Sequence, residues 1–331
     1  MEAPAACPAC GEPFAPGDAF CEACGAELPV TEVPSLEAPA PAGVACPSCG
    51  TVGEPVDAYC GSCGIRLPAP RDHTEVELAG VAGVSDKGKR HNRNEDAMAA
   101  FSGRGFVAAV VCDGVSSSVD PDVASEAAAG AALAVLAEER DLEAAFDAAR
   151  AAVLAIEFER RGNLSPPSCT FLAATVTDQT VTVASHGDCR AYWYAGGDLT
   201  QLTVDDSMAE VQIAAGMPAA DAHTNAFAHV ITRWLSADAE PEWRPRIVSL
   251  EVPEPGRLLL VSDGLWNYAI EPDDLAAVLA EGPSSISPEP VLDLARRLVA
   301  FANDAGGSDN ITVVVVDLPL SDLDLKGSPA P

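Results

Sequence analysis

Eight of the eleven cysteines form two sets that could each bind one metal ion. Each set has two Cys-x2-Cys pairs separated by ten residues, and the second set begins 39 residues after the first. The sets are Cys7, Cys10, Cys21 and Cys24, and then Cys46, Cys49, Cys60 and Cys63. A Cys-x2-Cys turn places two sulfurs on one side of a tight loop, and two such turns complete the tetrahedral site that Zn2+ prefers. The sequence therefore predicts two small zinc ribbons with structural zinc.

A disulfide framework is the alternative use of the same cysteines. The first residues, Met1-Glu2-Ala3-Pro4, lack the basic and apolar stretches of a secretion signal. This favours a reducing, cytoplasmic location and zinc over disulfides. The other three cysteines, Cys112, Cys169 and Cys189, lie in apolar or strand-like contexts and are expected to be buried thiols.

The charge of the chain excludes several classes of partner. Its 331 residues include 50 Asp and Glu against 19 Lys and Arg, a formal net charge of −31. Such a chain repels nucleic-acid phosphates and anionic membranes, so neither partner is expected. No run of about 18 apolar residues is present, so no membrane span is expected. The acidic residues also dominate 1–70, so the ribbons are expected to dock a protein, if anything.

Aspartates recur where an apolar run ends or at a sharp Gly or Asn turn. They are Asp113, Asp188, Asp263 and Asp309, joined near the start by the pair Glu95 and Asp96. One Asp-Gly is usually an ordinary turn. A carboxylate at the edge of an apolar strand is costly to desolvate unless it is paired or binds a cation. Several that converge predict an oxygen-rich site for Mg2+ or Mn2+.

A basic cluster immediately precedes the Glu95-Asp96 pair. Four of the 19 basic residues, Lys87, Lys89, Arg90 and Arg93, fall within seven positions around His91. Arg and Lys bind phosphate oxygens, so one interpretation is a phosphate-binding loop beside the metal site. A solvated loop without a ligand is the other.

The pattern of apolar residues predicts strands and helices beyond the ribbons. Strands are expected over 106–112, 171–177, 181–186, 191–194, 257–261 and 311–316, and helices over 123–139, 142–161, 273–280 and 291–303. Sequential strands with a few long helices favour an α+β sandwich with antiparallel sheets inside and helices outside. The expected organisation is ribbon 1 (1–30), a Pro/Ala linker (31–45), ribbon 2 (46–67), a short linker (68–73), the large domain (74–319) and a disordered tail (320–331).

The order of the acidic motifs resembles the metal-dependent protein phosphatase 2C-type (PPM) family, bacterial type. The motifs are Asn94-Glu95-Asp96, Asp113-Gly114, Gly187-Asp188-Cys189-Arg190, Leu202-Thr203-Val204-Asp205-Asp206-Ser207, Ser262-Asp263-Gly264 and Asp309-Asn310-Ile311-Thr312. The N-terminal cysteines resemble a double zinc ribbon. The resemblance implies an α-β-β-α sandwich with two central antiparallel sheets.

The same resemblance implies the metal ligands. Asp113 would bridge two Mn2+ or Mg2+ ions, with the Gly114 carbonyl helping one and Asp263 and Asp309 binding the other. Asp188 resembles the ligand of a weaker third ion.

Other roles are implied around these ligands. Glu95 and Asp96 would hold metal-bound waters, and Asn310 would orient Asp309. The segment 207–225 corresponds to a flap over the cleft.

The implied activity is that of a serine/threonine protein phosphatase. A water bridging the two ions would attack the phosphorus of phosphoserine or phosphothreonine in proteins that a Ser/Thr kinase has modified, within signal transduction. The ribbons would be a docking or regulatory module. A pseudophosphatase that binds phosphoproteins as a scaffold is the alternative, and a nucleic-acid-associated ribbon protein is disfavoured by the charge.

Two positions depart from common family members. His91 stands where many bacterial members have a phosphate-binding arginine, so His91, Arg90 or Arg93 would take that role. Val115 follows Gly114 where eukaryotic members often carry a histidine.

Overall fold

The computed structural model describes residues 10, 24, 26, 44–53, 59–252, 254–281 and 289–320. The chain divides into two compact units, Met1–Pro68 and Ala69–Pro331, and each is described by itself. Cys7 and Cys21 of the first predicted zinc site and most of the Pro/Ala linker lie outside the described residues. The second ribbon is described only in part and contains a two-stranded sheet of β1 (Val44–Ala45) and β2 (Val52–Gly53).

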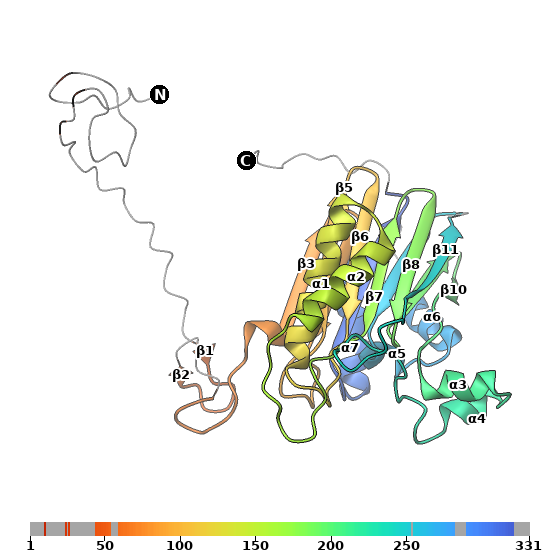
Figure 1. Cartoon of the computed structure of the whole chain (residues 1–331). Coiled ribbons are helices and arrows are strands. Elements are labelled where there is room, and N and C mark those ends of the chain that lie inside the picture. Colours follow the sequence, from red (N-terminus) through yellow and green to blue (C-terminus); the bar gives the residue numbers. More distant parts are fainter. Residues whose placement is uncertain are drawn as a thin grey trace. The chain divides into compact units, whose positions relative to one another are not determined.

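Two antiparallel sheets form the centre of the larger unit (Figure 1). The six-stranded sheet has the order β10-β9-β12-β13-β4-β3, and the five-stranded sheet has the order β11-β8-β7-β6-β5. The first sheet contains β3 (His73–Leu78), β4 (Val81–Asp86), β9 (Arg190–Ala195), β10 (Asp198–Gln201), β12 (Gly256–Val261) and β13 (Ile311–Leu318). The second contains β5 (Ala97–Gly103), β6 (Phe106–Cys112), β7 (Phe171–Val176), β8 (Thr180–His186) and β11 (Arg246–Glu251).

Helices cover the outer faces of both sheets. The five-stranded sheet carries α1 (Pro121–Glu138) and α2 (Leu142–Leu154), which lie together on one face in Figure 1. The six-stranded sheet carries α5 (Asp263–Trp266), α6 (Pro272–Ala280) and α7 (Val291–Ala305). Two short helices, α3 (Met208–Ala214) and α4 (Ala219–His223), follow β10, and a turn of 3-10 helix, η1 (Pro70–Asp72), precedes β3. No helix among the described residues is long and apolar enough to cross a membrane.

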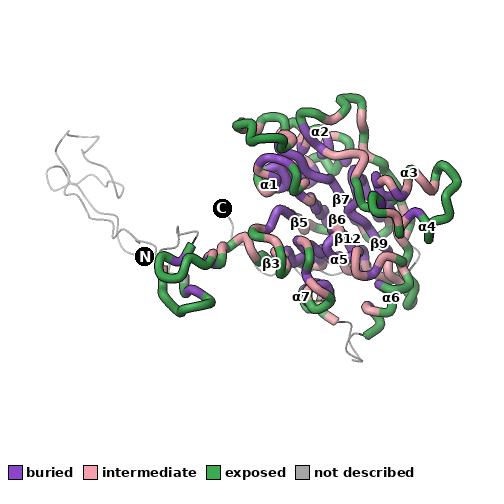
Figure 2. Tube along the Cα trace, turned by 90° about the horizontal axis from the view of Figure 1, so that it is seen from below, coloured by how far each residue is buried: buried purple, intermediate pink, exposed green. Residues whose placement is uncertain are grey.

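Alternation along the central strands builds three apolar layers. In β6, Phe106, Ala108 and Val110 pack under α1 and α2, whereas Val107 and Val111 face the other sheet. β13 behaves in the same way, with alternate residues facing α7 and the opposite sheet. Figure 2 shows the buried positions along β6, β7 and β12, the mostly half-buried α3 and the mostly exposed α4. The predicted α-β-β-α sandwich is confirmed.

One predicted helix is shorter than expected. The pattern predicts a helix over 142–161, but α2 ends at Leu154. Val153 is the last buried residue before Pro167. The intervening residues therefore gain no packing energy from a helix, and helices in proteins depend largely on such packing.

The C-terminal boundary also shifts by one residue. Leu320, placed in the expected disordered tail, is buried, and its backbone N–H donates to Oδ1 of Asp178 at 2.7 Å. The rest of that expected tail lies outside the described residues.

Candidate metal centre

The acidic residues meet because their strands end at the same edge of the sandwich. Cys112 at the end of β6 pairs with Ala97 at the start of β5, which places Asp113 and Asp96 on neighbouring strand ends. In the other sheet, Val261 at the end of β12 pairs with Val313 near the start of β13 and with Arg190 at the start of β9. Asp263 lies just after β12, Asp309 just before β13, and Asp188 just before β9.

Burial and mutual repulsion raise the pKa of every aspartate in this group. Burial is the main cause for Asp113, whose pKa lies well above the ordinary value, and the charges of the other four aspartates add to it. Burial likewise raises the pKa of Asp96 to about 6 and that of Asp188 to about 7. The pKa of Asp263 is well above its usual range and that of Asp309 is raised, again chiefly through burial. Carboxylates in this situation are stabilised by a bound cation.

The side chain of Asp96 has one oxygen that is fixed and one that is available. Oδ2 accepts hydrogen bonds from Ser262 Oγ at 2.8 Å and Thr312 Oγ1 at 2.7 Å. Oδ1 is buried and has no hydrogen-bond partner among the described residues. A buried carboxylate oxygen without a donor fits a metal ion or a water held beside one.

Glu95 is held on both sides of its carboxylate. Oε1 accepts from Arg93 Nε at 3.0 Å, and Oε2 accepts from Ser116 Oγ at 2.5 Å. Its backbone N–H donates to Oδ1 of Asn310 at 2.7 Å. The predicted water-holding pair Glu95 and Asp96 therefore lies on a segment whose position is fixed by long-range contacts.

Asn310 links the acidic segment to the basic loop. Its side-chain hydrogen bonds go to the backbone of these two segments. It accepts from Glu95 N and donates through Nδ2 to the carbonyls of Lys87 at 2.8 Å and Arg93 at 3.0 Å. Only its backbone N–H bonds Asp309, at Oδ1, 2.8 Å away. Asn310 therefore holds the basic loop through its side-chain amide and holds Asp309 through its backbone N–H.

Gly114 is required by close packing. A Cβ atom added there would lie 2.6 Å from the Glu95 carbonyl oxygen and 2.7 Å from the Pro121 carbonyl oxygen. A side chain would therefore push the acidic segment away from the end of β6.

The three candidates for phosphate binding are placed differently. His91 Nε2 lies 3.1 Å from Asp309 Oδ1, so the imidazole faces the acidic group. Arg93 is already paired with Glu95 and, at 3.0 Å, with Asp122. Arg90 is exposed.

A buried ion pair, Arg190 with Asp205, supports Asp188, and no role is assigned to this pair from the sequence. Arg190 donates to both oxygens of Asp205 at 2.8–3.1 Å, and both side chains are buried. The guanidinium also lies over the ring of Trp266, 3.7 Å from its centroid. Trp266 Nε1 in turn donates to the Asp188 carbonyl at 2.9 Å. The signal was present in the quoted motifs, since an Arg and an Asp in apolar surroundings need each other.

The supports of Asp96 were missed for a similar reason. Ser262 and Thr312 are fully buried hydroxyls at the ends of apolar strands, within motifs where only Asp263 and Asp309 were singled out. A hydroxyl in such a place needs a partner, and that requirement was the available signal.

The donor set fits divalent cations with oxygen ligands. It consists of carboxylates at the ends of rigid strands, one of them with a free buried oxygen, beside a tightly packed glycine. The acidic group is more open than the cysteine group. Among the described residues, only the four cysteines of ribbon 2 have donor atoms that all lie within 4.8 Å of one another.

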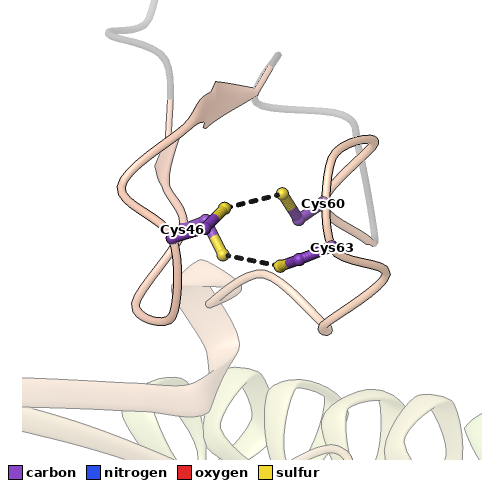
Figure 3. A group of neighbouring side chains, drawn as sticks. Cys46, Cys60 and Cys63 are labelled. Atoms are coloured by element: carbon purple, nitrogen blue, oxygen red, sulfur yellow. Dashed lines mark hydrogen bonds between the residues drawn. The ribbon is translucent and has the colours of Figure 1, made fainter.

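The cysteines of ribbon 2 project from two matching turns. Gly50 N donates to Cys46 O at 2.9 Å, and Gly64 N donates to Cys60 O at 2.8 Å. Figure 3 shows the sulfurs of the two turns facing each other. The Sγ atoms of Cys46 and Cys63 are 3.5 Å apart, and those of Cys49 and Cys60 are 3.6 Å apart. This convergence of four thiols matches a tetrahedral zinc site. In the larger unit, Cys112, Cys169 and Cys189 are buried as expected.

Two families match the two parts of the chain. Residues 86–301 match the family described as Protein phosphatase 2C, and residues 7–64 match the family described as Double zinc ribbon. The first match covers most of the chain, and the chain therefore belongs to the protein phosphatase 2C family, with a double zinc ribbon before the phosphatase-type domain.

Individual relatives agree with this assignment. The chain is 31% identical over 244 residues to the serine/threonine protein phosphatase PstP of Mycobacterium tuberculosis, covering 72% of this chain but only 44% of PstP. It is 27% identical over 257 residues to the serine/threonine phosphatase stp of Listeria monocytogenes, covering 97% of that protein.

Solved structures of relatives share the sandwich. The crystal structure of the Mycobacterium tuberculosis phosphatase PstP/Ppp has a TM-score of 0.59 at 29% identity, over 72% of this chain and 97% of that chain. The catalytic domain of PstP in complex with two manganese ions has a TM-score of 0.56 at 30% identity, over 74% and 99% of the two chains.

Proposed function

We propose that residues 74–319 form a metal-dependent serine/threonine protein phosphatase that hydrolyses phosphoserine and phosphothreonine. The observation that carries this proposal is the convergence of Asp113, Asp188, Asp263 and Asp309 with Glu95 and Asp96 at one edge of the sandwich. Family membership and the names of the relatives support it. Because the aligned part of the chain spans less than half of PstP, the activity is inferred from the site and its fold.

Divalent cations would be held by the strand-end carboxylates. Asp113 and the Gly114 carbonyl would bind on one side, Asp263 and Asp309 on the other, and Asp188 at a weaker third position. Two bound Mn2+ or Mg2+ ions supply Lewis-acid activation of a water near neutral pH. The manganese complex of the PstP catalytic domain supports this choice of ion.

The surrounding residues hold the nucleophilic water and the phosphate. Ser262 and Thr312 fix Oδ2 of Asp96, so Oδ1 would accept a hydrogen bond from this water. Glu95, held by Ser116, would accept a second one. His91, whose Nε2 lies 3.1 Å from Asp309 Oδ1, would contact a phosphate oxygen at the rim of the acidic group.

The ribbons contribute a structural module in this proposal. Each would bind one Zn2+, and ribbons with so few apolar residues fold on metal binding. Their acidic composition favours docking of a protein partner or regulator over nucleic acid. The substrates would be cytoplasmic phosphoproteins of a Ser/Thr kinase, which makes the protein part of a signalling pathway.

The test is hydrolysis of a phosphoserine or phosphothreonine peptide by the full chain. We expect turnover with Mn2+, loss of turnover with a chelator, and recovery when Mn2+ is restored. Metal-dependent binding of the phosphopeptide without turnover would instead support the scaffold alternative, a pseudophosphatase.

A further inference from the structure

Arg71 makes an unusual number of contacts for a residue at the start of the phosphatase-type unit. It lies in η1, and its side chain is 27% exposed. Nε donates to the Asn94 carbonyl at 2.9 Å, and Nη2 donates to the Asp96 carbonyl at 3.1 Å and the Asp122 carbonyl at 2.8 Å. Nη1 forms an ion pair with Glu126 at 2.5 Å. The guanidinium therefore joins the acidic Asn94–Asp96 segment to the first turns of α1.

The Asn94–Asp96 segment depends on such donors. It is irregular and buried, so its carbonyls have no strand or helix partners. A buried carbonyl without a donor is costly. Arg71 supplies the donors for Asn94 and Asp96, and Ser125 Oγ donates to the Glu95 carbonyl at 2.5 Å. Three successive carbonyls are thus satisfied from Arg71 and α1.

This contact is not explained by the helix itself. A cation near the N-terminus of a helix is unfavourable with respect to the helix dipole. The ion pair with Glu126 offsets that effect, but the guanidinium is aimed at carbonyls of the acidic segment. Its position follows from the segment that it holds.

Arg71 also lies outside the part of the chain that matches the phosphatase family. That match begins at residue 86, whereas Arg71 comes three residues after Pro68, where the ribbon unit ends. The linker that leads from the ribbons thus provides the residue that holds the acidic segment.

We propose that Arg71 is a positioning residue for the metal site. By fixing the backbone of Asn94–Asp96, Arg71 sets the affinity of this site for divalent cations. The proposal rests on the proposed function only in that the acidic group binds such cations. Without the guanidinium, Glu95 and Asp96 keep their side chains but lose the backbone position from which these face the ligands on the strand ends.

The experiment measures Mn2+ binding by the zinc-loaded full chain, using the electron paramagnetic resonance signal of free Mn2+. We expect Arg71→Ala to weaken Mn2+ binding at least about tenfold, as for other outer-sphere supports of metal sites. Arg71→Lys keeps the charge but not the several donors of the guanidinium, so the loss of Mn2+ affinity should be smaller than in Arg71→Ala.

Arg257→Ala is the matched control. Arg257 is 14% exposed, pairs with Asp317 and donates to the Glu289 carbonyl, at the other end of β12.

The outcomes separate this proposal from the proposed function. Weaker Mn2+ binding in Arg71→Ala and Arg71→Lys but not in Arg257→Ala supports the positioning role, even if wild type hydrolyses no phosphopeptide. Mn2+ affinity within twofold of wild type in Arg71→Ala overturns it. Should Arg71→Ala fail to fold, wild-type Mn2+ affinity in a folded Arg71→Lys overturns it as well.

Discussion

The imidazole of His91 lies against the carboxylate of Asp309, with Nε2 3.1 Å from Oδ1. Burial raises the pKa of Asp309, and the charge of His91 opposes that rise. The histidine therefore occupies the rim of the acidic group, on the side of the basic loop. Arg93, the nearest alternative, is engaged by Glu95 and Asp122.

His91 should contact the phosphate of the substrate. His91→Ala should raise KM more than it lowers kcat, because the contact is made largely with the ground-state phosphate. His91→Arg should keep or raise activity, because a guanidinium binds phosphate oxygens through several donors. Steady-state kinetics on a phosphopeptide measures both effects.

Arg90→Ala and Arg93→Ala distinguish His91 from its neighbours. If either raised KM far more than His91→Ala, the phosphate would be bound by an arginine of the loop and His91 would be a packing residue. For Arg93, a fall in kcat without a change in KM would instead reflect the release of Glu95.

Asp113→Asn should separate catalysis from stability. The substitution keeps the shape and removes the charge that the cations require, so activity should fall at least about 100-fold, beyond what outer-sphere changes usually cause. In the presence of a chelator the variant should be at least as stable as wild type, because one of the mutually repelling carboxylates is gone. Phosphatase assays at saturating Mn2+ and thermal unfolding with a chelator measure the two effects.

Asp147→Asn is the matched control for this substitution, since Asp147 is exposed on α2. It should leave both quantities unchanged. Wild-type turnover in Asp113→Asn at saturating Mn2+ would refute the assignment of the metal site.

Two classes of metal should be separable by chelation. A weak chelator should remove the oxygen-bound ions and stop catalysis reversibly, whereas thiolates should retain zinc. Metal analysis after gentle purification should find about two zinc per chain, one for each predicted S4 site, and Cys63→Ser should lower this to about one. Less than one zinc per chain in wild type would contradict the ribbon assignment.

The sequence predicts the central strands except β4, and it predicts none of the edge strands. β6 and β13 are buried on both faces and read as continuous apolar runs. β3 and β11 lie at the edges of the sheets and are exposed almost throughout, so their residues carry little hydrophobic pattern. β3 and β11 are ordered because they pair with β4 and β8. The local pattern of residues in a strand carries no information about such pairing.

The proposed metal ligands are predictable for a reason that does not extend to the residues that support them. A carboxylate at the end of an apolar strand is locally anomalous, so Asp113 and Asp263 stand out. Arg71 and Asn310 act through carbonyls far away in sequence, such as those of Asp96 and Lys87. Backbone carbonyls have no residue identity, so nothing in the sequence marks such partners.

A buried histidine at the end of β8, two residues before Asp188, should make stability depend on pH. His186 is 1% exposed and packs between the rings of Phe146 and Trp243, at centroid distances of 5.2 and 5.7 Å. Its Nδ1 has no hydrogen-bond partner among the described residues. Burial lowers the pKa of His186 to about 4, although the charge of Asp206 acts in the opposite direction.

The unfolded chain therefore binds a proton at His186 before the folded protein does. The folded state should lose stability as pH falls from about 6.5, the ordinary histidine pKa, to about 4, by about 3 kcal/mol in total. His186→Phe keeps an aromatic ring and removes the titration, so its stability should fall less over this range. Urea unfolding at several pH values, with a chelator present to exclude metal effects, gives the change of unfolding free energy with pH.

His73→Gln is the opposite control: burial lowers the pKa of His73, but Asp86 and Glu75 outweigh it and raise the pKa overall. Protonated His73 stabilises the fold at low pH, so its removal should steepen the acid loss. Equal slopes in wild type and His186→Phe would show that His186 does not remain neutral in the fold.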